Sequence, residues 1–257
     1  MNEVARALSR AFRGMLHPRM LLLALLPMLA ALAVWIGLAW VYWDTWSQWL
    51  AAAIAGSSAS QWLSPRTLER LVHYSALLLL ILAVAPMILV TALLIAALIV
   101  MPLVVDFVAA RDYPTLDKRR GGTLFGSVVN AMGATLIFAA LWIATLPLWL
   151  TGFLAPLLPL LLSAYLNQRL FRYDALSDHA SAEEMHALVR ASRGRLYLLG
   201  FLLALLYYVP LLNLLVPILS ALAFTYFALE RLAGLRAAHA REAGLIPGNG
   251  AAQIKRR

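Results

Sequence analysis

Long apolar stretches, separated by short polar segments rich in arginine, dominate the chain. The first runs from Met20 to Trp43 and the second from Tyr74 to Val105. A helix needs about 20 apolar residues, at about 1.5 Å of rise each, to cross the hydrocarbon core of a bilayer. Both stretches reach that length, and Pro27 lies early enough in the first to kink its helix rather than break it. The pattern therefore predicts two long transmembrane helices.

The last apolar stretch, Leu196–Leu229, is 34 residues long and is interrupted near its middle by Pro210, Asn213 and Pro217. Two full crossings would need about 40 residues and a turn, and one crossing would place both prolines and the asparagine at mid-membrane. Two helices of about 14 residues that enter and leave by the same face fit the length, provided that the turn is buried in protein or wet. We expect a partly penetrating hairpin here.

The stretch Leu124–Leu166 has a similar pattern, in which an apolar run is interrupted near its centre, although the interruption is less well defined. Prolines and a glycine break it near its centre, at positions 147, 152, 156 and 159. Its first arm is long enough to span the membrane, whereas its second arm, Phe153–Leu166, is short for a crossing. We therefore predict an all-α integral membrane fold with two long transmembrane helices and two partly penetrating helical hairpins. Whether the hairpin at 124–166 reaches the far side stays open.

The distribution of basic residues predicts the orientation. They gather before Met20, in 106–126, in 167–195 and after Leu229, whereas the two hairpin turns carry none and 44–73 carries only two. Cytoplasmic segments of membrane proteins are enriched in lysine and arginine. All four basic segments fall on one side if two helices cross and two hairpins return, so both termini are expected in the cytoplasm. This arrangement accounts for the formal net charge of +9, and no nucleic-acid partner is expected.

Residues 1–232 are expected to form a single membrane domain, and 233–257 a disordered, basic cytoplasmic tail. Within the basic segment 167–195, Ser181 and Glu184 have the spacing of a capping box, which predicts a short amphipathic helix at the cytoplasmic surface. The segment Asp44–His73, with four tryptophans in and beside it, is typical of an interfacial belt with a short loop helix.

Catalytic chemistry finds little support in the sequence. The chain has no cysteine, and none of its histidines, at 17, 73, 179, 186 and 239, lies three or four residues from another. Thiolate chemistry is therefore excluded, and we find no helical metal pair, nucleotide-binding loop or hydrolase motif. We expect no enzyme activity, no cofactor and no metal.

A few polar residues in apolar surroundings are candidates for function. Asn213 is either a turn residue that caps the hairpin helices or a hydrogen-bonding group on a solute path, since broken helices at membrane depth expose N–H groups that suit anions. Arg19 is either a snorkelling anchor of the first span or an anion contact. Asn130 is expected to make an interhelical hydrogen bond rather than a ligand contact, and Pro18 to start the first helix.

Four stretches together carry a family resemblance. They are Phe12–Pro18, Met101–Ala110, the arginine-rich Tyr165–Arg195 and, as the best match, Gly200–Pro217 with its Pro-Leu-Leu-Asn run. They resemble the CysZ-like family of bacterial inner-membrane proteins, which share the etoposide-induced 2.4 domain. The likeness covers most of residues 10–232. It implies two long transmembrane helices, two partly penetrating hairpins, oligomers, and a role in sulfate entry for cysteine synthesis.

One departure from the family pattern concerns the substrate. The resemblance implies that the anion is held near a Pro-Gly-hydrophobic-Arg-Arg motif at the start of the first long helix, but here those positions read Pro18-Arg19-Met20-Leu21-Leu22. A dehydrated dianion needs charge-assisted hydrogen bonds, so the loss of both motif arginines should weaken sulfate binding there. Arg19, Met20 and Asn213 are the candidate substrate-binding residues.

The sequence thus predicts a CysZ-like permease or channel of the bacterial inner membrane for sulfate or another small anion. It is expected to contact membrane lipids and to form a homo-oligomer. The alternative, favoured by the two leucines in place of motif arginines, is a non-transporting membrane scaffold or assembly protein.

Overall fold

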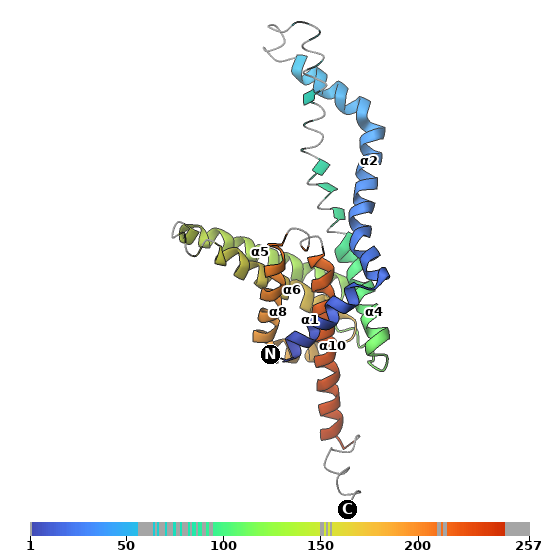
Figure 1. Ribbon diagram of the computed structural model, residues 1–257, viewed down its shortest axis with the longest axis vertical. Coiled ribbons are helices and arrows are strands. Elements are labelled where there is room, and N and C mark those ends of the chain that lie inside the picture. The colour runs from blue at the N-terminus through green and yellow to red at the C-terminus, as the bar shows by residue number, and fades with distance from the viewer. Residues whose placement is uncertain are drawn as a thin grey trace, which may run out of the picture. The chain divides into compact units, whose positions relative to one another are not determined.

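The fold is that of a computed structural model (Figure 1). The structure describes residues 2–55, 64, 66, 70, 74–75, 78, 82, 84–85, 87–88, 91–92, 95–149, 152, 154, 156–209, 212 and 215–244. These residues form helices and turns and contain no strand. They divide into two compact units: one comprises Met1–Leu21 and Met101–Arg257, and the other Leu22–Val100.

The second unit is built on α2 (Pro18–Ala55), which begins at Pro18 as predicted and passes Pro27 without a break. The helix continues beyond the apolar stretch that ends at Trp43, because residues 44–55 contain neither proline nor glycine. The indole N–H of Trp35 donates to the hydroxyl of Thr91 at 2.9 Å, so α2 packs against part of the second predicted span. Within that span, Tyr74–Val105, residues 76–77, 79–81, 83, 86, 89–90 and 93–94 lie outside the described residues.

The end of the second predicted span passes through a π-helical turn, η2 (Ala96–Val100), into α4 (Met101–Asp112). Pro102 lacks the N–H that would continue regular helical hydrogen bonding, and an irregular turn beside a proline is an expected consequence. The loop after α4 is held against residues 177–180 by backbone hydrogen bonds, among them Gly121 N–H to Ala180 O at 2.8 Å. A Cβ at residue 121 would lie 2.4 Å from backbone atoms, so only glycine fits this contact.

Helices α5 (Leu124–Trp149) and α6 (Leu157–Ser177) form an antiparallel pair. Contacts between residue 130 and residue 169, and between residue 127 and residue 174, show the direction. Helix α5 passes Pro147 and ends at Trp149, and α6 begins at Leu157, so both ends lie near the centre of the stretch, where the sequence predicted a break. In Figure 1 the two helices lie side by side over their length.

The capping box at Ser181 is confirmed. The Ser181 hydroxyl accepts a hydrogen bond from the Glu184 backbone N–H, and the Glu184 carboxylate accepts one from the Ser181 backbone N–H. It starts the predicted short helix, α7 (Ala182–Ala191), whose buried residues include Leu188. Helix α8 (Arg193–Leu206) follows after a single residue and is 14 residues long, the length expected for one arm of the last hairpin.

The core of this unit forms around α10 (Val216–Glu242), which is buried along nearly all of 216–229. Helices α1 (Asn2–Met15), α4, α6 and α8 pack against it. The helix runs on to Glu242, so the expectation of a disordered tail from 233 is wrong for 233–242. This segment contains seven alanine, leucine and arginine residues, which favour a helix, and it has no proline and no glycine other than Gly234. Residues 245–257 of the predicted tail lie outside the described residues.

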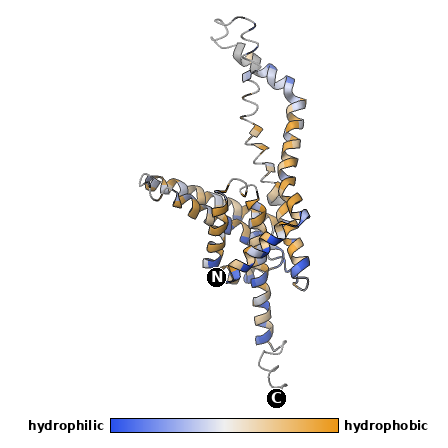
Figure 2. Ribbon diagram, in the orientation of Figure 1, coloured by the Kyte–Doolittle hydropathy of each residue, from blue (hydrophilic) through white to orange (hydrophobic). Residues whose placement is uncertain are grey.

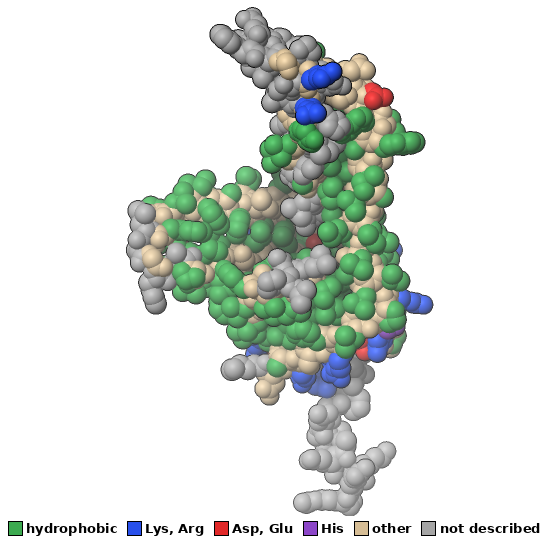
Figure 3. Space-filling model, turned by 45° about the horizontal axis from the view of Figure 1, so that its top comes forward, with side chains coloured by type: hydrophobic (Ala, Val, Ile, Leu, Met, Phe, Trp, Pro, Cys, Tyr) green, Lys and Arg blue, Asp and Glu red, His purple; other side chains and the backbone are tan. Residues whose placement is uncertain are grey.

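Three helices of the described part are long and apolar enough to cross a membrane. They are Pro18–Trp49, Leu124–Trp149 and Val216–Glu242. The most apolar window of the first two is 11% and 6% buried, whereas that of the third is 72% buried. Exposed apolar surface of this extent on α2 and α5 would be unstable in water, so we infer that it faces lipid. Figure 2 shows α5 and the middle of α2 as mainly hydrophobic, and in Figure 3 hydrophobic side chains cover the α5–α6 pair.

Candidate functional site

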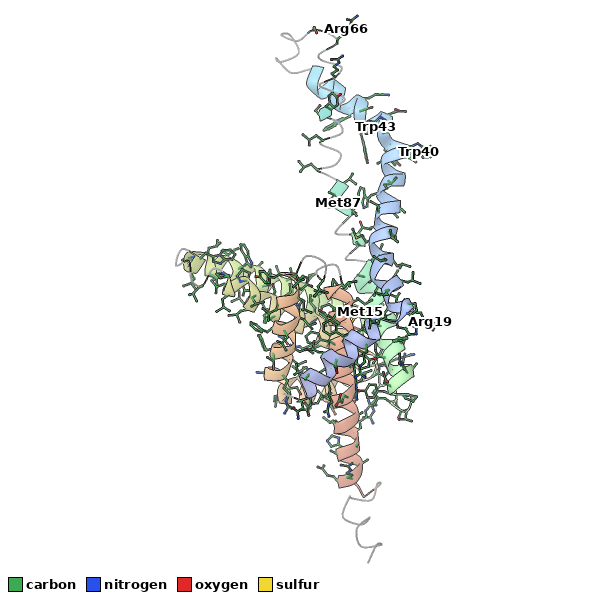
Figure 4. The ribbon with its side chains drawn as sticks, in the orientation of Figure 1. Met15, Arg19, Trp40, Trp43, Arg66 and Met87 are labelled. Atoms are coloured by element: carbon green, nitrogen blue, oxygen red, sulfur yellow. The ribbon has the colours of Figure 1, made fainter. Side chains whose placement is uncertain are left out.

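Of the three sequence candidates, the structure describes Arg19 and Met20, and these two side chains lie in different environments. Arg19 is exposed at the second residue of α2, and its side chain points outward in Figure 4. The side chain of Met20 is only 1% exposed, so it packs within the protein. Asn213 lies outside the described residues. A role in substrate binding stays a prediction for each of them.

Asn130, by contrast, makes the interhelical hydrogen bond that the sequence predicted. Its side-chain amide, on α5, donates to the backbone carbonyl of Arg169 on α6 at 3.0 Å. The contact is made at the part of α6 where the sequence changes from leucines to polar residues. This polar stretch is therefore held inside the helical bundle rather than free in solvent.

The polar stretch of α6 contains Asn167, Gln168, Arg169 and Arg172. Asn167 and Gln168 are buried, and the two arginines are half-buried. The guanidinium of Arg172 donates to the Gln168 side-chain oxygen at 2.8 Å. Nε of Arg169 and Nδ2 of Asn167 are buried and have no hydrogen-bond partner within the described protein. Buried donors without partners are uncommon, so these atoms have capacity for a further ligand.

The electrostatic environment of these arginines is unusual. No carboxylate of the described chain lies within ion-pair distance of Arg169 or Arg172. Burial lowers the pKa of Arg172 from its ordinary value, and the positive charges of Arg169 and Arg193 act in the same direction. We call Arg169, Arg172 and Arg193 the α6–α8 arginine cluster. It is a local excess of positive charge at the junction of two helices.

Two tyrosines border the cluster. Tyr165 on α6 and Tyr197 on α8 lie with ring centroids 6.4 Å apart, and both are near enough to Arg172 to affect its pKa. A phenol hydroxyl can donate a hydrogen bond to an anion. The cluster therefore combines guanidinium groups with neutral donors.

A small, mainly apolar hollow lies beside the cluster. Arg172, Ser192 and Arg231 are its polar lining residues, and α6, α7, α8 and α10 all contribute to its wall. Arg231 is already engaged, because its guanidinium donates to Ser192 Oγ at 3.3 Å and to Glu3 at 3.2 Å. Arg172 is thus the lining cation whose charge has no carboxylate partner among the residues described.

Other arginines of the same unit are neutralised. Three glutamates each bind two arginines from other parts of the chain, namely Glu3 with Arg195 and Arg231, Glu184 with Arg119 and Arg236, and Glu230 with Arg6 and Arg10. We call these nine residues the glutamate-centred layer. The hydrogen bond from Arg236 lowers the pKa of Glu184, which keeps that carboxylate charged despite its burial. Lysine and arginine side chains gather along one edge of the unit in Figure 3.

One half-buried carboxyl lies on α6 itself. Asp174 accepts a hydrogen bond from the Ser127 hydroxyl of α5, and burial raises the pKa of this aspartate. Sequence reasoning missed both Asp174 and the arginine cluster as site features. It had assigned the whole of 167–195 to a basic cytoplasmic segment, and nothing local to the sequence shows which arginines lack carboxylate partners.

Of the comparisons with known proteins, the one with family models found a match. The family model described as "Sulfate transporter CysZ/Etoposide-induced protein 2.4" matches residues 7–217, which is most of the chain. No curated protein and no solved structure matches the chain. The description of the family is that of a transporter and not of an enzyme. Its match confirms the family resemblance found in the sequence, and the chain belongs to the sulfate transporter CysZ/etoposide-induced protein 2.4 family.

Proposed function

We propose that the protein is a permease or channel of the bacterial inner membrane that passes a small oxyanion, sulfate being the first candidate. The observation that carries this proposal is the match of residues 7–217 to a family described as a sulfate transporter. The chemistry of the α6–α8 arginine cluster also supports this proposal. A dianion that leaves water needs several charge-assisted hydrogen bonds, and unneutralised guanidinium groups provide them.

The proposal includes two long transmembrane helices and two partly penetrating hairpins. Helix α8, with 14 residues, is about 21 Å long, which is less than the roughly 30 Å of a hydrocarbon core. Helix α10 is long enough to cross but is mostly covered by protein, as expected for a hairpin arm inside a bundle. Helix α5, with 26 residues and an exposed apolar surface, is long enough for its hairpin to reach the far side.

Orientation and assembly are further parts of the proposal. The basic edge that includes the glutamate-centred layer and the α6–α8 cluster is placed on the cytoplasmic side, together with both termini. Lipid covers the exposed apolar faces, and copies of the chain associate as a homo-oligomer, as the family resemblance implies. No nucleic acid or cofactor takes part in this account.

Reconstitution tests the function directly. The purified full-length chain is placed in liposomes, and uptake of radiolabelled sulfate is compared with uptake by protein-free vesicles of the same lipid. We expect uptake above the protein-free level, and excess unlabelled sulfate should compete with it. Leu21 and Leu22, which replace the motif arginines of the family, favour the rival function of a non-transporting scaffold. That rival predicts no flux of sulfate, phosphate or another small anion above protein-free vesicles.

A further inference from the structure

The α6–α8 junction is a point of very close helix packing. A Cβ built on Gly200 of α8 would lie 2.7 Å from the carbonyl oxygen of Ala164 on α6, so the two backbones touch at this glycine. The same Cβ would meet Gln168 at 3.4 Å, one turn further along α6. The next turn of α6 carries Arg172, which lines one hollow together with Ser192, the residue just before α8. Arg172 therefore lies level with the start of α8.

Three sources of positive potential meet there. Arg169 and Arg172 come from α6, and Arg193 is the first residue of α8. The N-cap Ser192 provides no side-chain cap hydrogen bond to α8, so the N–H groups of the first helical turn are not capped by it. The N-terminal end of a helix carries partial positive charge. Like charges held together are destabilising unless something compensates them.

From this geometry we propose that the α6–α8 arginine cluster is a binding site for a tetrahedral oxyanion, either free sulfate or phosphate or the phosphate of a lipid headgroup. This proposal rests on the proposed function, because it assumes that the protein binds a small oxyanion. The site supplies the guanidinium groups that α2 lacks at Leu21 and Leu22. Guanidinium groups bind tetrahedral oxyanions through paired N–H donors. The buried and unpartnered Nε of Arg169 is the donor that most requires such a ligand.

Gln168 is a positioning residue of this site. Its amide oxygen accepts a hydrogen bond from Arg172 at 2.8 Å and orients the guanidinium without neutralising it. A glutamate at 168 would accept the same hydrogen bond with nearly the same shape but would cancel the positive charge. Gln168→Glu therefore separates the charge of the cluster from its packing. Arg241→Gln is the matched control, because Arg241 is exposed near the end of α10 and its loss changes the net charge by the same unit.

The test measures binding and not transport. Radiolabelled sulfate and phosphate are equilibrated by dialysis with the full-length protein in a neutral detergent, for wild type, Gln168→Glu, Arg169→Gln/Arg172→Gln and Arg241→Gln. We expect wild type and Arg241→Gln to bind alike, and the other two variants to bind roughly tenfold more weakly or worse. Circular dichroism and elution volume verify that each variant is folded.

A second arm identifies the source of the oxyanion. Phosphatidylglycerol retained by each variant is counted by native mass spectrometry. Retention of this lipid by wild type but not by Gln168→Glu, with no binding of free anions, assigns the site to a lipid phosphate. Equal binding of every probe by wild type and Gln168→Glu overturns the site, and so does a wild type that binds none of them. Binding without flux in liposomes would remove the proposed function and keep the site, whereas flux with equal binding would do the reverse.

Discussion

The two arginine-bearing regions of the larger unit differ in one respect, which is the presence of carboxylates. In the glutamate-centred layer, each of Glu3, Glu184 and Glu230 is shared by two arginines, and the pairs connect α1, α7, α8 and α10. In the α6–α8 cluster, Arg169 and Arg172 have no carboxylate within reach among the described residues, although both are half-buried, as are Arg10, Arg231 and Arg236 of the layer.

This difference separates two uses of the same side chain. A neutralised arginine that joins helices contributes to the fold, since removal of one partner leaves a buried charge uncompensated. A half-buried arginine without a carboxylate partner lowers the stability of the folded protein. We explain its presence by the binding of an anionic ligand. The positive-inside pattern alone does not distinguish the two groups, because both belong to basic segments that the sequence predicts to be cytoplasmic.

The largest effect on stability should come from the glutamate-centred layer. Glu184→Gln leaves Arg236, whose side chain is 14% exposed, with neutral partners only, which are the new amide and the backbone carbonyls of Asp117 and His179. We expect the variant to lose about 2–4 kcal/mol of unfolding free energy at neutral pH. The measurement is the midpoint of thermal unfolding, followed by tryptophan fluorescence in detergent. A midpoint equal to that of wild type would show that the layer does not hold the helices together.

The same variant has a defined pH dependence. The folded-state pKa of Glu184 is lowered, first by the hydrogen bond from Arg236. Its stabilisation is therefore complete at neutral pH, above the ordinary value of 4.5, and is lost as the pH falls through the lower folded pKa. The advantage of wild type over Glu184→Gln should shrink below pH 4.5. A difference that is constant from neutral to acid pH would contradict this assignment.

A somewhat smaller effect is expected where α6 and α8 touch. Gly200→Ala forces the new Cβ against the Ala164 carbonyl, and the helices must separate, at a cost of about 1–3 kcal/mol. Because separation also moves Arg172 away from Arg193, oxyanion binding should fall along with stability. The control is Gly194→Ala, at a helical glycine of α8 whose Cβ would meet no atom within 4 Å. Equal midpoints for the two alanine variants would refute the close approach.

The interhelical hydrogen bond of Asn130 is worth less. Asn130→Ala removes the donor to the Arg169 carbonyl, and we expect a loss of about 0.5–1.5 kcal/mol in unfolding free energy. Thermal unfolding is again the measurement. Oxyanion binding should change less than in Gly200→Ala, because the arginine side chains keep their positions. A fall in binding as large as that of Gln168→Glu would mean that Asn130 itself contacts the anion.

The smallest loss of stability is predicted for the cluster. Arg169→Gln/Arg172→Gln removes two positive charges that no carboxylate of the described chain compensates, so the unfolding free energy should fall by no more than about 1 kcal/mol or rise slightly. Sulfate added to wild type should raise its unfolding midpoint, and this rise should be absent from the double variant. A destabilisation as large as that of Glu184→Gln would place these arginines among the structural ones.

The correct predictions from the sequence depend on local features or on the length of an apolar stretch. The capping box joins residues only three apart, Pro18 starts its helix by its own fixed backbone angle, and the length of α8 follows from an apolar run that ends before Pro210. The interhelical contact of Asn130 was also predictable, because a lone amide in an apolar helix needs a partner. Which partner it has was not.

The remaining features depend on distant parts of the chain. Arg231 and Glu3 are 228 residues apart, and Arg193 lies near enough to affect the pKa of Arg172 because α6 and α8 pack closely at Gly200. Helices α2 and α10 continue beyond the apolar stretches that end at Trp43 and Leu229, because polar residues such as Asp44 and Glu230 are compatible with a helix. Charge pairing, and hence the candidate site, therefore needed the three-dimensional structure.

The central claim is that unneutralised arginines on α6 serve the passage of a small oxyanion. Uptake of radiolabelled sulfate into liposomes that contain equal amounts of wild type, Gln168→Glu or Arg241→Gln tests it most directly. We predict uptake above protein-free vesicles for wild type and Arg241→Gln, and uptake roughly tenfold lower for Gln168→Glu. Uptake by Gln168→Glu equal to that of wild type would contradict the account.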